Sequence, residues 1–326
     1  MREKEVLMAK GARKIVETCA TVSKGEKVLI ITDLEKSNIA NLLAWALYED
    51  DIEPVIVIMF PNEYDGQEPP EIIAQAMTKA DVIILPLTRS ISHSYAVHSA
   101  LERGARVLSM HGFLEEHMYI GGINADFKKQ RSECNRFADY FTNSNTVKIT
   151  SPGGTNFTAS IEGRQGNSDS CIVDKPGVFS SVPGIEANIA PVENTSEGVV
   201  FVDGSVPNFG IGVPKTPIKI EIKGGNVKDI SGGKEANFLK KLLADMGDSS
   251  VLNIAQIAIG LNPEIKDFNG NEADDHGVYG TAHIGIGTSY NLGGEVKAPI
   301  HYDVMISNPT VIFDNKKVID KGDIIG

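Results

Sequence analysis

Short apolar runs alternate with helical patterns through the N-terminal third of the chain, and this alternation limits the possible folds more than any other feature. The apolar runs cover residues 27–33, 54–59, 81–86 and 105–110, and helical spacing covers 4–23, 37–49, 70–79 and 94–103. Continuously apolar strands are typical of a parallel sheet that helices cover on both faces. The sequence therefore predicts an N-terminal doubly wound α/β domain. No glycine-rich phosphate-binding pattern follows these strands, so no nucleotide is expected.

The second half of the chain has a different pattern of apolar and turn-forming residues. After a helix expected over 124–143, short strand patterns at 147–150, 154–161, 198–204 and 218–222 are separated by Gly, Pro, Asn and Ser. One more helix is expected at 233–245, and residues 262–279 lack apolar periodicity and are expected to form a long loop. We therefore predict two domains, an α/β domain over 1–145 and a β-rich α+β domain over 146–326.

Composition excludes several classes of partner. The 326 residues carry a formal net charge of −12, so no basic surplus exists to neutralise nucleic-acid phosphates or anionic lipid. No run of about 18 apolar residues is present, and no membrane span is expected. The 3 cysteines are far apart in the sequence, which argues against a disulfide framework or a CxxC metal site. We expect a cytoplasmic protein.

Two histidines and an aspartate near the C-terminus form a candidate metal site. His301 and Asp303 are two residues apart in a strand-like run, so their side chains point to the same face. His283 lies in a second strand-like run and can reach the same point if the two strands pair. Two imidazoles and a carboxylate leave coordination positions open for water or substrate. This pattern predicts a metalloenzyme whose site lies in the second domain.

Each candidate also has a purely structural interpretation. His301 can be a buried strand histidine paired with Asp303, and His283 can be a hydrogen-bonded core residue. His276 follows two aspartates and could line the site from its loop, although a solvated acidic loop is the favoured interpretation there. His111 and Asp33 follow apolar strands of the first domain, where the carboxyl ends of parallel strands often build pockets.

Several segments in order resemble the metallo-aminopeptidase family of aminopeptidases T and S, often labelled leucyl aminopeptidase. The segments are 182–191, 197–204, 253–263, 280–290 and 299–305. The resemblance implies two metal ions held by two glutamates, two histidines and an aspartate, with a tyrosine assisting catalysis. Zinc, cobalt or manganese would fit. The matching positions are Glu186, His283, Tyr290, His301 and Asp303, and the second glutamate is replaced by Gln256.

Gln256 sets this chain apart from the peptidase pattern, because a neutral amide cannot accept a proton from metal-bound water at neutral pH. Gln256 can instead be a weak ligand or a structural hydrogen bonder. The chain also resembles 2,5-dihydroxypyridine 5,6-dioxygenase, a non-heme iron enzyme whose site likewise ends in an HxD pair. The resemblance implies that the third iron ligand of that enzyme is a histidine nearer the segment that contains Gln256. Here His283, His301 and Asp303 could supply an Fe(II) triad.

The functional expectation is a metal-dependent hydrolase that removes N-terminal residues from small peptides or cleaves a related amide. Glu186, Gln256, His283, His301 and Asp303 would surround the metal, Glu186 would also serve catalysis, and Tyr290 would stabilise the oxyanion. The first alternative is a non-heme Fe(II) dioxygenase that opens a hydroxylated pyridine ring. The second is a metal-binding protein without catalytic activity. A homo-oligomer is expected from the resemblance alone.

Overall fold

The computed structural model describes residues 3–92 and 94–326, and its contacts group into two compact units. Unit 1 comprises Met1–Arg131 and Asp169–Ile185, and unit 2 comprises Ser132–Ser168 and Glu186–Gly326. The chain therefore passes between the units three times. The expected division between residues 145 and 146 stays a prediction.

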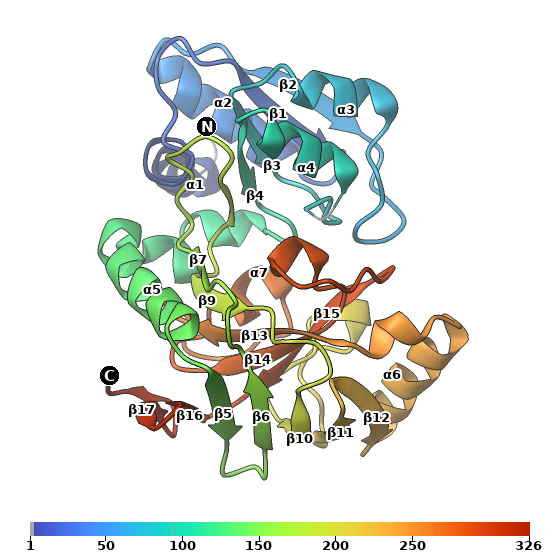
Figure 1. Cartoon of the computed structure of the whole chain (residues 1–326). Coiled ribbons are helices and arrows are strands. Elements are labelled where there is room, and N and C mark those ends of the chain that lie inside the picture. The colour runs from blue at the N-terminus through green and yellow to red at the C-terminus, as the bar shows by residue number, and fades with distance from the viewer. Residues whose placement is uncertain (1–2, 93) are drawn as a thin grey trace. The chain divides into compact units, whose positions relative to one another are not determined.

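Unit 1 is built on a five-stranded parallel sheet with the order β2-β1-β3-β4-β8 (Figure 1). Its strands are β1 (Val28–Asp33), β2 (Val55–Met59), β3 (Val82–Leu85), β4 (Arg106–Ser109) and β8 (Phe179–Ser181). Its helices are α1 (Glu3–Lys14), α2 (Ser37–Glu49), α3 (Glu71–Met77) and α4 (Tyr95–Glu102). A π-helical turn over Ile15–Cys19 continues α1, and 3-10 turns cover Glu115–Met118 and Gly121–Asn124.

Alternation along each strand explains the packing of this sheet. Leu29, Ile83 and Val107 point to one face, where they form a buried cluster with Ile73 of α3 and Val97 of α4. Residues between them, such as Ile30, are equally buried and point to the other face, and α2 packs against β1. The expected α/β architecture is therefore confirmed. The strand at 55–59 differs from expectation, because it is an edge strand with largely exposed side chains.

Unit 2 contains two antiparallel sheets. The larger has the order β12-β11-β10-β6-β5-β16-β17-β18. Its strands are β5 (Thr146–Thr150), β6 (Asn156–Ser160), β10 (Glu197–Val202), β11 (Ile218–Lys223), β12 (Asn226–Ser231), β16 (Thr310–Phe313), β17 (Lys316–Asp320) and β18 (Asp323–Ile324). The helix α6 (Lys234–Asp245) packs against β11 and β12, and 3-10 turns cover Asn208–Gly210 and Ser249–Leu252. The helix α5 (Phe127–Thr142) spans the boundary between the two units.

The smaller sheet has the order β15-β14-β13-β9-β7. Its strands are β7 (Asn167–Asp169), β9 (Glu186–Ile189), β13 (Ile254–Gly260), β14 (Ala282–Gly287) and β15 (His301–Ile306). Every residue of β9, β13 and β14 is buried, and so are the last five of β15. The expected loop at 262–279 contains a short helix, α7 (Glu272–Asp275), and the 3-10 turn η6 covers Tyr290–Leu292. A polar side chain on these strands is therefore shielded from solvent. No helix in the described part of the chain is long and apolar enough to cross a membrane.

Candidate metal centre

Strand register brings the predicted ligands to one face of the smaller sheet. Gln256 on β13 lies opposite Gly285 on β14, and Gly285 lies opposite Asp303 on β15. Residues in one such row share a face, as do residues two positions along a strand. His283 and His301 therefore point to the same side as Asp303. Pairing of β9 with β13 adds Glu186, which lies opposite Gly260.

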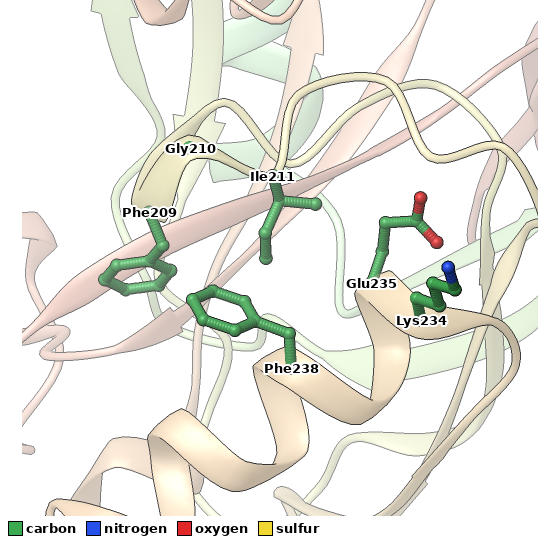
Figure 2. A pocket seen from close by; sticks show the side chains of 6 residues that line it. All are labelled: Phe209, Gly210, Ile211, Lys234, Glu235 and Phe238. Carbon is green, nitrogen blue, oxygen red and sulfur yellow. The ribbon is translucent and has the colours of Figure 1, made fainter.

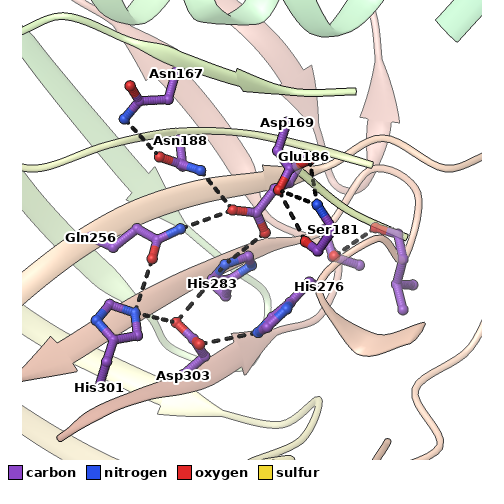
Figure 3. Close-up of polar contacts among 12 residues, drawn as sticks. Asn167, Asp169, Ser181, Glu186, Asn188, Gln256, His276, His283, His301 and Asp303 are labelled. Carbon is purple, nitrogen blue, oxygen red and sulfur yellow. Dashed lines mark hydrogen bonds and ion pairs between the residues drawn. The ribbon is translucent and has the colours of Figure 1, made fainter. Parts of the chain in front are cut away.

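The side chains meet around one oxygen of Asp303 (Figure 3). His301 Nε2 lies 3.4 Å from Asp303 Oδ1, and His283 Nε2 lies 4.0 Å from the same atom. His283 Nε2 is also 3.4 Å from Glu186 Oε2. The side chains of His283, Asp303 and Glu186 are 1, 5 and 9% exposed, so this convergence of polar atoms is buried.

Gln256 joins two members of this group. Its amide nitrogen donates to Glu186 Oε1 at 2.9 Å, and its carbonyl oxygen lies 3.0 Å from His301 Nε2. Asn188 Nδ2 also donates to Glu186 Oε1, at 2.7 Å, and the other ring nitrogen of His301 faces the carbonyl of Thr288 at 2.9 Å. Gln256 is thus a bridge between a carboxylate and an imidazole.

His276 joins the centre against expectation. Its Nε2 lies 3.0 Å from Asp303 Oδ2, and its ring stacks on His283 with centroids 5.2 Å apart. The ligand atoms of His276, His283 and Asp303 all lie within 4.8 Å of one another. The interpretation of His276 as part of a solvated acidic loop is therefore wrong. The short separation of His276 from His283 along the chain was the one signal in the sequence that His276 belongs to the site. Sequence patterns could not show that the loop before β14 folds back toward Asp303.

The unsatisfied atoms at the centre fit a metal ion. Neither ring nitrogen of His283 has a hydrogen-bond partner among the described residues, and Asp303 Oδ1 has none. Leaving buried polar atoms unpaired costs roughly 1–3 kcal/mol each. A divalent cation held by His283 Nε2 and Asp303 Oδ1, which lie 4.0 Å apart, would satisfy these two atoms, and two imidazoles with one carboxylate form a common ligand set for such ions. The residues therefore fit a divalent metal ion.

Burial and mutual charge shift the pKa values of the group. Burial lowers the pKa of His283 to about 3 although Asp303 opposes this, so His283 is neutral at neutral pH. Burial also disfavours charge on His276, but the hydrogen bond and charge of Asp303 raise its pKa to about 10. The pKa of His301 is raised in the same way. Burial alone would raise the pKa of Asp303, but the facing imidazoles of His301 and His276 hold it well below its usual range.

Tyr290 is not brought into this group. It begins the 3-10 turn η6, is 49% exposed, and has Lys297 Nζ 4.0 Å above its ring. Its backbone nitrogen donates to the carbonyl of Val296. These contacts belong to the segment that links β14 to β15, so the catalytic role expected for Tyr290 stays a prediction.

A separate hollow of about 340 Å³ lies in unit 2 between η4 (Asn208–Gly210) and α6 (Figure 2). Phe209 and Phe238 both line it. Phe209 also packs on Tyr302, which points away from the face that carries His301 and Asp303. The hollow is thus on the opposite side of β15 from the histidines. The candidate centre is the buried cluster and not this hollow.

The fold and the site define a class of two-unit α/β proteins with a buried histidine–carboxylate cluster. The chain belongs to the 2,5-dihydroxypyridine 5,6-dioxygenase family, whose sequence model matches residues 8–326. A 2,5-dihydroxypyridine 5,6-dioxygenase from Pseudomonas putida is 26% identical over 189 residues. That match covers 55% of this chain and 54% of the relative, so it spans about half of the relative's length.

Two solved structures share the fold over almost the whole chain. The 2,5-dihydroxypyridine dioxygenase of Pseudomonas putida matches with a TM-score of 0.83 and 19% identity, covering 98% of this chain and 97% of its own. AmpT from Thermus thermophilus matches with a TM-score of 0.74 and 15% identity, covering 98% and 99%. The resemblance to aminopeptidase T is therefore confirmed at the level of fold.

The family assignment corrects the functional expectation. The family model and the relative both indicate an oxygenase, so the preferred interpretation as a hydrolase, aminopeptidase or metalloprotease is wrong. The physical reason is that both kinds of protein share this fold, so segments that preserve it do not separate their chemistries. Gln256 was the contrary signal, because it removes a carboxylate that the peptidase pattern requires. The first alternative has the better support.

Proposed function

We propose that this protein is an Fe(II)-dependent dioxygenase that opens a hydroxylated pyridine ring, with 2,5-dihydroxypyridine as the first substrate to test. The observation that carries the proposal is Asp303 Oδ1, which is buried without a hydrogen bond and faces two imidazole nitrogens. The family is named for this reaction. In it, the bond between ring carbons 5 and 6 breaks and both atoms of O₂ enter the product.

Asp303, His283 and His301 would hold the ion. Two histidines and one carboxylate on one face leave other positions open, as in the facial triad of non-heme iron oxygenases. Bound Fe(II) would supply the redox chemistry that allows O₂ to react with the ring. This proposal does not require zinc, cobalt or manganese, the ions expected for a peptidase, although the same ligands could bind them.

Glu186 would orient substrate and accept a proton from a ring hydroxyl. Its Oε1 receives two amide donors, from Asn188 and Gln256, which fix the carboxylate while Oε2 faces His283. A carboxylate at position 256 would instead repel Glu186 across about the same distance. The amide of Gln256 therefore favours a centre with a single ion.

Anaerobic loading of the purified protein with Fe(II) tests the proposal directly. When 2,5-dihydroxypyridine in air-saturated buffer is added, we expect O₂ and 2,5-dihydroxypyridine to be consumed in equimolar amounts, the latter followed by the loss of its ring absorbance. His301→Ala should abolish both iron retention and turnover, whereas His98→Ala, which alters an exposed histidine, should change neither. Protein that binds one Fe(II) but consumes no O₂ with any dihydroxypyridine would refute the proposal.

The remaining expectations need separate measurements. The homo-oligomer and the cytoplasmic location stay predictions, as do the small-molecule substrate class and the metal identity. Elemental analysis of protein purified without added metal addresses the last point. About one equivalent of iron supports the proposed enzyme, and two equivalents of zinc would contradict the single-ion centre.

A further inference from the structure

The loop before β14 delivers an additional histidine to the centre. His276 follows α7, and its Nε2 meets Asp303 Oδ2 at 3.0 Å. The other carboxylate oxygen, Oδ1, has no hydrogen-bond partner among the residues that the structure describes, and it faces His301 and His283. The two oxygens of Asp303 therefore face different partners.

A buried carboxylate holds the His276 loop in shape. Asp275 is fully buried, and its oxygens accept hydrogen bonds from the backbone nitrogens of Asn269 and Gly270, both at 2.9 Å. The hydroxyl of Ser205 donates to Asp275 Oδ2 at 2.5 Å. Asn269 also donates to the neighbouring Asp274 at 2.7 Å. The side chains of Asp274 and Asp275 thus hold the loop together through hydrogen bonds within it.

The segment 205–208, whose Ser205 bonds Asp275, also holds β15, the strand that carries Asp303. The backbone nitrogen of Met305 donates to the carbonyl of Ser205 at 2.8 Å. The backbone nitrogen of Asp303 donates to the side chain of Asn208 at 3.1 Å. Asp303 is therefore fixed at its backbone through Asn208 and at Oδ2 through His276.

We propose that His276 is a positioning residue that holds Asp303 Oδ2 and so turns Oδ1 toward the metal, without being a ligand itself. The inference rests on the proposed function, because it assigns a task to the carboxylate of that centre. Groups that hydrogen-bond a ligand commonly contribute 10- to 100-fold to metal affinity. The stack of His276 on His283 restricts both rings further.

Co(II) binding tests this role without any assay of turnover. Calorimetric titration gives affinity and stoichiometry, and the visible absorption of bound Co(II) reports the ligand set. His276→Ala should weaken binding about 10- to 100-fold with unchanged stoichiometry. His276→Gln places an amide donor near the position of Nε2 and should restore most of the affinity with a spectrum like that of the wild type.

His283→Gln is the matched comparison, because it makes the same replacement at a proposed ligand. We expect it to lose binding and to change the spectrum. If His276→Gln behaves like His283→Gln, His276 is a ligand and the positioning role is refuted. If His276→Ala binds as tightly as wild type, the residue has no role at the centre. His98→Gln controls for the substitution on the surface, and circular dichroism shows which variants are folded.

Ser205→Ala tests whether the hydrogen bonds of Asp275 support the position of His276. Ser205 bonds Asp275 and does not bond Asp303. The substitution should weaken Co(II) binding by a smaller factor than His276→Ala, and the double variant should lose no more than His276→Ala alone. Additive losses would mean that Ser205 does not act through His276. A wild-type protein that binds no Co(II) or Fe(II) would instead overturn the proposed function.

Discussion

At the scale of single residues, the centre depends on which atoms are left unpaired. The buried carboxylate of Asp303 has one oxygen hydrogen-bonded and one not, and His283 is held neutral by burial. Buried polar atoms without partners are rare because of their desolvation cost. Their presence at one point, close to His301, distinguishes this candidate metal site from an ordinary buried ion pair.

Gly285 makes room for this arrangement. A Cβ added at Gly285 would lie 2.6 Å from Gln256 Cβ and 2.7 Å from His301 Nε2. Gly285→Ala should therefore displace His301 and weaken Co(II) binding about tenfold or more, as measured by calorimetric titration. Gly11→Ala is also crowded, against the carbonyl of Met118, but Gly11 lies on α1 of unit 1, whereas the residues of the centre belong to unit 2. This substitution should lower the thermal midpoint and leave Co(II) affinity intact, and equal losses in affinity would contradict this account.

Gln256 offers a second prediction at this scale. Gln256→Glu places a carboxylate where an amide now donates to Glu186 at 2.9 Å. In metal-free protein the buried like charges should lower the thermal midpoint, because one carboxyl must become protonated. Co(II) should raise that midpoint more than it does in wild type, and calorimetry should detect a second binding event. An unchanged metal-free midpoint would show that position 256 does not face Glu186.

At the scale of elements, the loop 269–276 shows how buried acidic residues can form a rigid structure. Asn271 caps α7 by accepting from the backbone nitrogen of Ala273, and Asp275 accepts three hydrogen bonds on its inner side. Loops with internal bonds of this kind are often functional. The loop thus supplies His276 through local hydrogen bonding as well as through apolar burial.

Asp275→Asn tests that loop. An amide cannot accept at both of its ends, so at least one buried donor loses its acceptor, and we expect the free energy of unfolding to fall by about 1–3 kcal/mol. Burial raises the pKa of Asp275, so the unfolded chain ionises first as pH rises. The unfolded state then binds fewer protons, and the contribution of Asp275 to stability falls between its unfolded and folded pKa values. Urea titrations across mildly acidic pH should show this fall in wild type and not in the variant.

At the scale of the whole molecule, the chain builds unit 1 from two separate stretches. Residues 169–185 return to it and supply β8, which pairs with β4. A long stretch of chain separates β4 from β8. For this reason no local sequence pattern indicates that the two strands pair. The boundary predicted between residues 145 and 146 would place β8 outside the part of the chain that supplies the other strands of its sheet.

A polypeptide of residues 1–145 should consequently fold less stably than unit 1 in the full chain. Without β8, the edge of β4 loses its hydrogen-bond partners, so amide exchange in β4 should be faster than in the intact protein. Exchange in β1, at the centre of the sheet, should change less. Mass spectrometry after deuterium labelling measures both. Equal protection of β4 in the two proteins would mean that β8 contributes nothing to unit 1.

The sequence by itself determined the α/β character of the N-terminal half and the positions of most helices and strands. Local periodicity is enough for this, because each pattern is read within one element: residues 37–49 and 234–245 form the expected helices. The grouping of His283, His301 and Asp303 also followed, because strand alternation and one pairing place them on a common face.

Only the tertiary structure decided what surrounds that group. The entry of His276, the bridge made by Gln256 and the exposed position of Tyr290 depend on how loops fold back and on the register between β9 and β13. Those features come from contacts between residues far apart in the chain, and no local pattern records them. Chemistry was hardest to infer, since one fold occurs in proteins with different reactions.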